Sequence, residues 1–295
     1  MTAQLTAGRL DVPGASLYYE VRGSGPLVLV VGQPMTSEPF GPLADQLSDR
    51  NTVVTYDPRG LGRSTVDDPS LDVTPELEAD DLAGLVEALG GGPADVFASS
   101  GGAVAGLALA ARHPELVRTL VAHEPPLTDL LPDADHIRAV VDGIAESFRR
   151  DGSGAAWGGF VSLVMYEGQL TGPQVPPASW PPPGQEPTGG DGAASQEPPP
   201  PPSAKQQADD ALFFLRMLKP FSRYQPDVEA LGSGKPRVVI AVGKSSADEV
   251  AVRATRVLAE RLGVTPTAFP GDHAGFMADP AAFADALRRV LDGTD

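Results

Sequence analysis

The stretch Asp95–Ala103 constrains the fold of this chain most, because its character changes abruptly within a few residues. It begins as an apolar run typical of a buried strand, passes through two serines and two glycines, and continues as an Ala- and Leu-rich helical segment. A serine at such a turn is held in a strained conformation with its hydroxyl exposed, and the turn needs small residues two positions to either side. Ala98 and Gly102 meet this requirement for Ser100, which is therefore the candidate nucleophile.

Apolar runs of strand length recur along the chain and alternate with segments of helical spacing. An alternating strand, paired with the residues just before it, precedes a series of runs that are apolar on both faces, as in a parallel sheet. Strand and helix alternating in this way predict a doubly wound, mostly parallel α/β sheet with right-handed crossovers. The predicted strands are 9–12, 16–22, 27–31, 52–56, the run that leads to Ser100, 117–122, 237–242 and 266–270.

The composition limits the partners and the compartment. A net charge of −17 and a pI near 4.5 argue against nucleic acid or an anionic membrane as a partner, because phosphates would be repelled. The chain has no cysteine, which excludes disulfides, thiolate metal sites and a thiol nucleophile. Neither a signal-peptide pattern nor an apolar run of the ~20 residues that cross a bilayer is present, so we expect a cytoplasmic protein.

The strand and helix alternation stops between residues 125 and 234, where helical patches occur at 137–148, 160–166 and 209–217. Within this region, residues 171–204 are rich in proline and poor in apolar side chains. Such a composition cannot offset its own ordering entropy, and the sequence predicts a disordered insertion there.

A serine hydroxyl needs a base to take its proton, and the base needs a carboxylate to hold it in the right tautomer. Of the four histidines, His273 is the candidate base, because it lies in a Gly-rich loop after the last predicted strand. A loop there reaches across the carboxyl edge of the sheet, where Ser100 is expected.

The chain resembles the α/β-hydrolase fold proteins over most of its length. The residues that carry the resemblance are Val30–Pro34, Tyr56–Ser64, Ala98–Gly102 and Gly271–His273, of which the Asp-x-Arg-Gly-x-Gly-x-Ser pattern from Asp57 to Ser64 is the most specific. In the family this pattern supports the nucleophile turn, so we assign no catalytic role to Asp57 or Arg59.

The resemblance implies a core made of residues 1–124 and 235–295, with residues 125–234 as a helical cap over Ser100. It also implies that the backbone N–H groups of Gln33 and Gly101 form the oxyanion hole. The sequence departs from the family at Val31–Gly32, where a His-Gly pair is usual, and at Gln33, whose side chain is able to reach the pocket.

Two residues compete for the role of the triad acid. The family commonly places an Asp after the strand that follows the cap, but Ser246 occupies that place here, and Asp248 follows at what reads as the first turn of a helix. Other members place the acid one strand beyond the nucleophile, where this chain has Glu124 followed by two prolines. We favour Glu124 over Asp248, and both preserve the order Ser, acid, His.

The expected function is therefore a serine hydrolase that cleaves an ester or thioester bond of a small, largely apolar molecule. The cap supplies the apolar residues predicted to line the pocket: Trp157, Phe160, Met165, Tyr166, Phe213, Phe214 and Met217. Nothing in the sequence indicates a cofactor or a metal site. A carbon–carbon bond hydrolase, an acyltransferase and a ligand-binding protein without catalysis remain open, because fold does not fix chemistry. The sequence indicates neither the substrate nor the oligomeric state.

Overall fold

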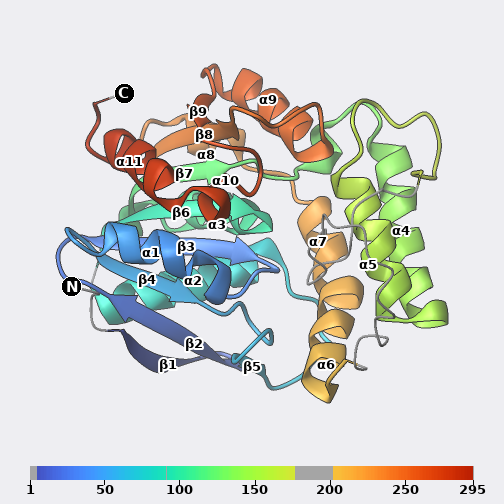
Figure 1. Ribbon diagram of the computed structural model, residues 1–295, viewed down its shortest axis with the longest axis horizontal. Coiled ribbons are helices and arrows are strands. Elements are labelled where there is room, and N and C mark those ends of the chain that lie inside the picture. Colours follow the sequence, from blue (N-terminus) through green and yellow to red (C-terminus); the bar gives the residue numbers. More distant parts are fainter. Residues whose placement is uncertain (1–4, 91, 177–201, 295) are drawn as a thin grey trace, which may run out of the picture.

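A computed structural model describes residues 5–90, 92–176 and 202–294 of the chain. The centre of the described part is a nine-stranded sheet with the order β1-β2-β4-β3-β6-β7-β8-β9, and the short β5 pairs with β2 (Figure 1). The strands are β1 (Thr6–Val12), β2 (Ala15–Arg22), β3 (Leu27–Gln33), β4 (Thr52–Tyr56), β5 (Thr65–Val66), β6 (Ala94–Ser100), β7 (Val117–His123), β8 (Arg237–Gly243) and β9 (Thr267–Phe269).

The sheet is parallel from β4 to β9 and antiparallel at the β1 and β2 edge, which confirms the predicted fold class. The parallel register pairs Gln33 of β3 with Ser100 of β6, and Ser99 of β6 with His123 of β7. Because parallel strands end at the same edge, the residues that follow β3, β6 and β7 meet at one side of the sheet.

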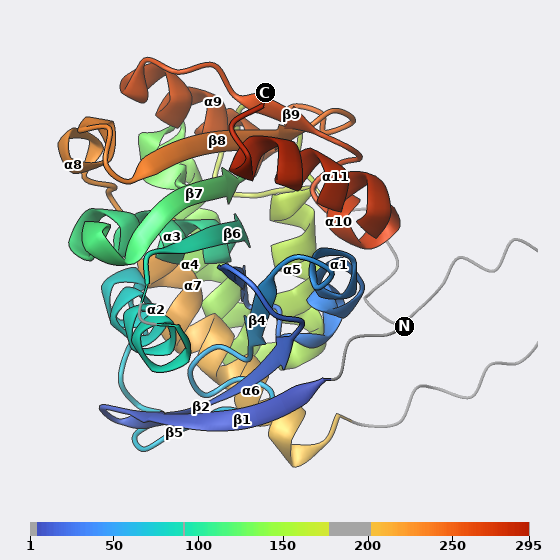
Figure 2. The same ribbon diagram turned by 90° about the vertical axis from the view of Figure 1, so that its left-hand side faces the viewer.

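Helices cover both faces of the sheet, as the apolar pattern of β3 requires. Leu29 and Val31 belong to a core cluster with residues of α2, α3 and α9, whereas Val28 and Val30 belong to a second cluster with residues of α1 and α11. Figure 2 shows α2, α3 and α8 on one side of the strands and α1, α10 and α11 on the other. The helices of these layers are α1 (Gly41–Leu47), α2 (Pro75–Leu89), α3 (Gly101–Arg112), α8 (Val228–Gly232), α9 (Val250–Leu262), α10 (Gly275–Ala278) and α11 (Pro280–Leu291).

Most of the segment between β7 and β8 forms a separate helical layer beside the sheet (Figure 1), whereas α8 near its end lies with α2 and α3 on one face of the sheet. The helices of the separate layer are α4 (Ala134–Asp151), α5 (Ser153–Val164), α6 (Ala204–Leu212), the π-helical turn η4 (Phe213–Met217) and α7 (Leu218–Ser222). Three short 3₁₀ turns complete the described elements: η1 (Glu38–Phe40), η2 (Pro114–Leu116) and η3 (Thr128–Leu130). Of the predicted disordered insertion, residues 177–201 lie outside the described residues.

Two helix ends differ from the prediction. The helix whose first turn was expected to contain Asp248 begins at Val250, because residues before it form turns in which the N–H of Ser246 bonds to the carbonyl of Gly243. The helix predicted to include Tyr166 ends at Val164. In the described part of the chain, no helix has the length and apolar character that crossing a membrane requires.

Candidate active site

Ser100 lies at the junction of β6 and α3 with φ 58° and ψ −129°. A non-glycine residue rarely adopts a positive φ, and the strain costs about 1–3 kcal/mol. The small residue predicted two positions later is required, because a Cβ at Gly102 would lie 2.5 Å from the carbonyl oxygen of Val31. The turn therefore brings β6 and α3 too close to β3 for a larger side chain.

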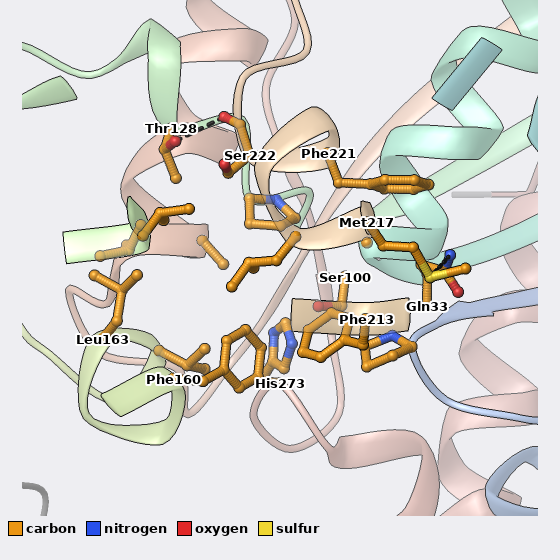
Figure 3. Close-up of a pocket in the computed structure, with 18 residues that line it drawn as sticks. Gln33, Ser100, Thr128, Phe160, Leu163, Phe213, Met217, Phe221, Ser222 and His273 are labelled. Carbon is orange, nitrogen blue, oxygen red and sulfur yellow. Dashed lines mark hydrogen bonds between the residues drawn. The ribbon is translucent and has the colours of Figure 1, made fainter. Parts of the chain in front are cut away.

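His273 lies in the loop between β9 and α10, and both it and Ser100 line one cavity. Figure 3 shows the two side chains next to each other in that cavity. The Nδ1 atom of His273 lies 2.6 Å from Oε2 of Glu124. An ionised carboxylate only accepts hydrogen bonds, so this contact keeps the proton on Nδ1 and leaves Nε2 free to act as a base.

Glu124 directly follows β7 and is completely buried. Its backbone has φ 50°, which turns the side chain out of the sheet register at the strand end. Oε1 accepts hydrogen bonds from the N–H of Gly243 at 2.8 Å and from the hydroxyl of Ser246 at 2.6 Å. One carboxylate oxygen thus binds Gly243 at the end of β8 and Ser246 just after it, and the other binds His273.

These donors decide the charge of Glu124. Burial alone would raise the pKa of the Glu124 carboxyl, but the hydrogen bond from His273, the electrostatic attraction of the neighbouring His123 and His273 rings and the hydrogen bond from Ser246 outweigh burial and lower the pKa to about 2. Glu124 is therefore ionised throughout the neutral range.

The other candidate acid, Asp248, lies on the surface before α9 and not in its first turn. Its carboxylate accepts a hydrogen bond from Arg256 at 2.6 Å, and both side chains are more than half exposed. The structure thus brings together Ser100, His273 and Glu124, and it leaves Asp248 outside the cavity.

His123, the residue before Glu124, is buried behind His273, and the two rings stack with centroids 6.2 Å apart. Its Nδ1 lies 3.2 Å from the hydroxyl of Ser99, whereas its Nε2 has no hydrogen-bond partner within the described residues. Burial lowers the pKa of His123 to about 4, so the ring is neutral. The described residues contain no group of three or more His, Cys, Asp or Glu arranged to hold a metal ion.

Asp57 and Arg59, which the sequence analysis assigned to structural support, do not line the cavity. The buried carboxylate of Asp57 accepts hydrogen bonds from the N–H of Ser37 at 2.9 Å and from Nε of Arg63 at 2.8 Å. Arg59 forms a buried ion pair with Asp81. The bond with Ser37 ties the loop after β4 to the loop after β3, and the ion pair with Asp81 ties it to α2.

The backbone groups predicted for the oxyanion hole lie beside Ser100. Gly101 is the first residue of α3, so its N–H has no partner within the helix. Gln33 ends β3, and its buried side chain donates from Nε2 to Sδ of Met217 at 3.4 Å. Gln33, Gly101 and Met217 all line the cavity.

The cavity comprises about 670 Å³ of empty space, part of which opens to solvent. Of the predicted cap residues, Phe160, Phe213 and Met217 line it, whereas Trp157 and Phe214 pack behind Phe213 in an aromatic cluster. Met165 is largely exposed, and neither it nor Tyr166 lines the cavity, because α5 ends before both residues. Further apolar lining residues are Val141, Leu163, Val164, Leu218, Phe221 and Val250.

The residues that hold Glu124 were not predicted from the sequence. Ser246 stands where the resemblance led us to expect the acid, and its hydroxyl binds the carboxylate that follows β7. A polar residue in place of the expected acid was the only sign of this partner. Thr128 and Ser222, two hydroxyl residues in the cavity wall, were not predicted either.

Comparisons of the sequence with known proteins give consistent results. The sequence profile described as alpha/beta hydrolase fold matches residues 25–176. The uncharacterized hydrolase YraK of Bacillus subtilis is 45% identical over 125 residues, which are 42% of this chain and 46% of that protein. The 2-(acetamidomethylene)succinate hydrolase of Mesorhizobium japonicum is 40% identical over 115 residues, which are 39% of this chain and 41% of that protein. The chain thus spans less than half the length of the curated relatives it matches.

Solved structures resemble the whole chain. A thermophilic esterase from Thermogutta terrifontis has a TM-score of 0.69 at 19% identity, with 99% of both chains covered. A hydrolase from Pseudomonas aeruginosa PA01 has a TM-score of 0.66 at 21% identity, with 97% of this chain and 98% of that chain covered. At such low identity these likenesses concern the fold alone. Because the profile match covers more than half of the 295 residues, and the sheet and its helices agree with it, the chain belongs to the alpha/beta hydrolase fold family.

Proposed function

We propose that this protein is a serine hydrolase that cleaves an ester or thioester bond of a small, largely apolar and uncharged molecule. The observation that carries the proposal is the contact between His273 and the ionised, buried Glu124, in the cavity that also contains the strained Ser100. A carboxylate, an imidazole and a hydroxyl in this order are the groups that acyl transfer to serine requires.

In the proposed first step, Oγ of Ser100 attacks the substrate carbonyl while Nε2 of His273 takes the hydroxyl proton. Glu124 stabilises the imidazolium that forms, because its carboxylate already binds the Nδ1 proton. The oxyanion accepts hydrogen bonds from the N–H groups of Gly101 and Gln33. A donor of this kind typically contributes about 3–4 kcal/mol to the transition state.

The tetrahedral intermediate then collapses. His273 returns its proton to the leaving alcohol or thiol, and the acyl group stays on Ser100 as an ester. Water attacks that ester with His273 as the base, and the carboxylic acid leaves as Ser100 regains its proton. The net reaction adds one water molecule and needs no cofactor.

The pocket wall supports an uncharged, apolar substrate. Among the described residues that line it, none is Lys, Arg, Asp or Glu, and most are aliphatic or aromatic. The net charge of −17 adds a long-range field that disfavours the approach of anions. For this reason we do not extend the succinate-type substrate in the name of the Mesorhizobium relative to this chain.

A fluorophosphonate probe tests the proposal directly, because it reacts with a serine only where a base activates the hydroxyl. We expect an adduct on Ser100, located by peptide mass spectrometry, that is absent in S100A and strongly reduced in H273A. The matched control is D248N, in which the exposed carboxylate outside the cavity is removed and labelling is expected to persist. Absence of an adduct on the folded wild-type protein would overturn the proposal.

A further inference from the structure

Two hydroxyl groups that the mechanism above does not use lie in the mainly apolar wall of the cavity. Thr128 begins η3, shortly after β7, and Ser222 ends α7. Both side chains line the cavity, and both residues are less than one tenth exposed. A buried polar group in an apolar wall costs free energy unless its hydrogen bonds are made, so its partners define what it still offers.

The hydrogens of both hydroxyl groups are engaged. The hydroxyl of Thr128 donates to the carbonyl oxygen of Ser222 at 2.7 Å, and the hydroxyl of Ser222 donates to the carbonyl oxygen of Lys219 at 3.1 Å. A carbonyl cannot donate, and a hydroxyl carries a single hydrogen. Toward the cavity, Thr128 and Ser222 therefore offer only oxygen lone pairs, which are hydrogen-bond acceptors.

The side-chain amide of Gln33 also has its donor group engaged within the protein. Its Nε2 is directed at the sulfur of Met217, which is able only to accept, and its buried Oε1 has no hydrogen-bond partner among the described residues. Gln33 thus presents no free donor to the cavity, and Thr128 and Ser222 offer acceptors to a bound molecule. A carboxylate or phosphate on the substrate would meet oxygen lone pairs and no cation.

The two hydroxyl groups lie away from the reacting serine. Figure 3 shows Thr128 and Ser222 joined by their hydrogen bond and set apart from Ser100, His273 and Gln33. Because a separation seen in projection is never larger than the true one, these groups face a part of the substrate remote from the scissile carbonyl. Most of the other side chains that line the cavity are aliphatic or aromatic, among them Leu163 and Leu218.

We propose that Thr128 and Ser222 form a distal subsite that accepts a hydrogen bond from a hydroxyl or N–H group of the substrate. This inference rests on the proposed function and names its substrate class. The preferred substrate is an uncharged ester or thioester with an apolar body and one hydrogen-bond donor at the end remote from the scissile bond. Substrates with an anionic group at that end are selected against.

The test compares substrates of equal length that differ only at the remote end. One series consists of p-nitrophenyl esters of butanoic, hexanoic and octanoic acids, each with its ω-hydroxy and ω-carboxy analogue. A second series carries the same groups on the alcohol side of acetate esters. In at least one series we expect kcat/KM for the ω-hydroxy ester to exceed that of the plain ester by about fivefold, equivalent to ~1 kcal/mol. The ω-carboxy ester is expected to be the poorest substrate.

The decisive quantity is the ratio of kcat/KM for the ω-hydroxy ester to kcat/KM for the plain ester, measured with one variant, because a loss of folded enzyme lowers both values equally. T128V and S222A are each expected to bring the ratio close to one. The matched control is T255V, because Thr255 is also buried and donates its hydroxyl to a carbonyl, that of Ala251, but does not line the cavity. T255V is expected to keep the wild-type ratio.

The possible failures are distinguishable. Ser100-dependent hydrolysis with a ratio near one in both series, or with the ω-carboxy ester preferred, would overturn the distal subsite and leave the proposed function standing. A ratio that T128V and S222A leave unchanged would also overturn it. Absence of hydrolysis of every ester by the folded wild-type protein would overturn the proposed function, and the subsite with it.

Discussion

Two glutamates in this fold are equally buried and reach opposite charge states. Glu124 at the end of β7 and Glu78 on α2 are 0% and 1% exposed. The pKa of Glu124 is lowered to about 2, whereas burial, together with the charge of Asp81, raises the pKa of Glu78 to about 8. At neutral pH the first is a carboxylate and the second is a carboxylic acid.

The difference lies in the hydrogen-bond donors around each side chain. Both oxygens of Glu124 are bound, by His273, Ser246 and the N–H of Gly243. Glu78 accepts a hydrogen bond from the hydroxyl of Tyr56 at 3.0 Å, with a weaker contribution from Arg59, and its Oε1 has no partner in the part of the chain that the structure describes. Burial is common to both residues, so the hydrogen-bond donors and the neighbouring charges, imidazole rings beside Glu124 and the carboxylate of Asp81 beside Glu78, decide which of them is ionised.

The largest effect is expected from E124Q. The amide carries no negative charge, and its NH₂ group is able to donate a hydrogen bond to Nδ1 of His273, which favours the tautomer with the proton on Nε2. We therefore expect kcat/KM for p-nitrophenyl hexanoate to fall about 10³–10⁴-fold. The matched control is E78Q, the same chemical change at an equally buried glutamate that lies outside the cavity, and it is expected to keep wild-type activity. Retention of a tenth or more of the activity in E124Q would contradict an essential carboxylate.

The sequence predicted the sheet and the turn that carries Ser100, because local patterns determine both. Apolar runs of strand length identified the parallel strands, and small residues around Ser100 identified the turn. The strands and the turn need only neighbouring residues and the rule that parallel strands end at one edge. Glu124 became a candidate acid through the resemblance to a fold in which some members place the acid one strand beyond the nucleophile.

The sequence did not predict which groups each carboxylate meets. Ser246 lies 122 residues from Glu124 along the chain, and the contact depends on how the turns after β8 are closed. The helical pattern of α2 indicated an apolar face and gave no sign that Glu78 and Asp81 are buried with it. A buried charged residue has the same local pattern as an exposed one, so only the packed structure distinguishes them.

The second effect concerns stability and comes from E78Q. Glu78 ionises near 4.5 in the unfolded chain and near 8 in the folded protein. Its contribution to stability is therefore complete below pH 4.5 and is lost as the pH rises through about 8. The amide does not ionise, so the free energy of unfolding of E78Q does not decrease in this way. Relative to the wild type it is expected to rise by on the order of 2–4 kcal/mol between the acidic and the basic end of this pH range.

Urea unfolding at a series of pH values across this window measures the effect. The matched control is E76Q, because Glu76 is an exposed glutamate in the first turn of the same helix. E76Q is expected to follow the pH dependence of the wild type. If the unfolding free energies of E78Q and the wild type change with pH in parallel, the pKa of Glu78 is the same in the folded and unfolded states. Glu78 is then not a buried carboxylic acid that contrasts with the ionised Glu124.

The smallest effect is expected from S246A, which removes one of the two donors to Oε1 of Glu124 and keeps the other. A hydrogen bond to a charged group contributes ~1.5–3 kcal/mol, but Gly243 and His273 still hold the carboxylate. We therefore expect kcat/KM to fall about tenfold, with most of the loss recovered in S246T, which restores a hydroxyl. S245A, at the neighbouring serine, is the control and is expected to leave kcat/KM unchanged.

The size of the S246A effect reveals how the charge of Glu124 is maintained. A loss as large as that of E124Q would mean that the carboxylate leaves His273 when a single donor is removed. Wild-type activity in S246A would mean that the N–H of Gly243 and the contact with His273 are sufficient. A tenfold loss that S246T reverses would show that the donors act in parallel, so that Glu124 becomes gradually more like Glu78 as they are removed.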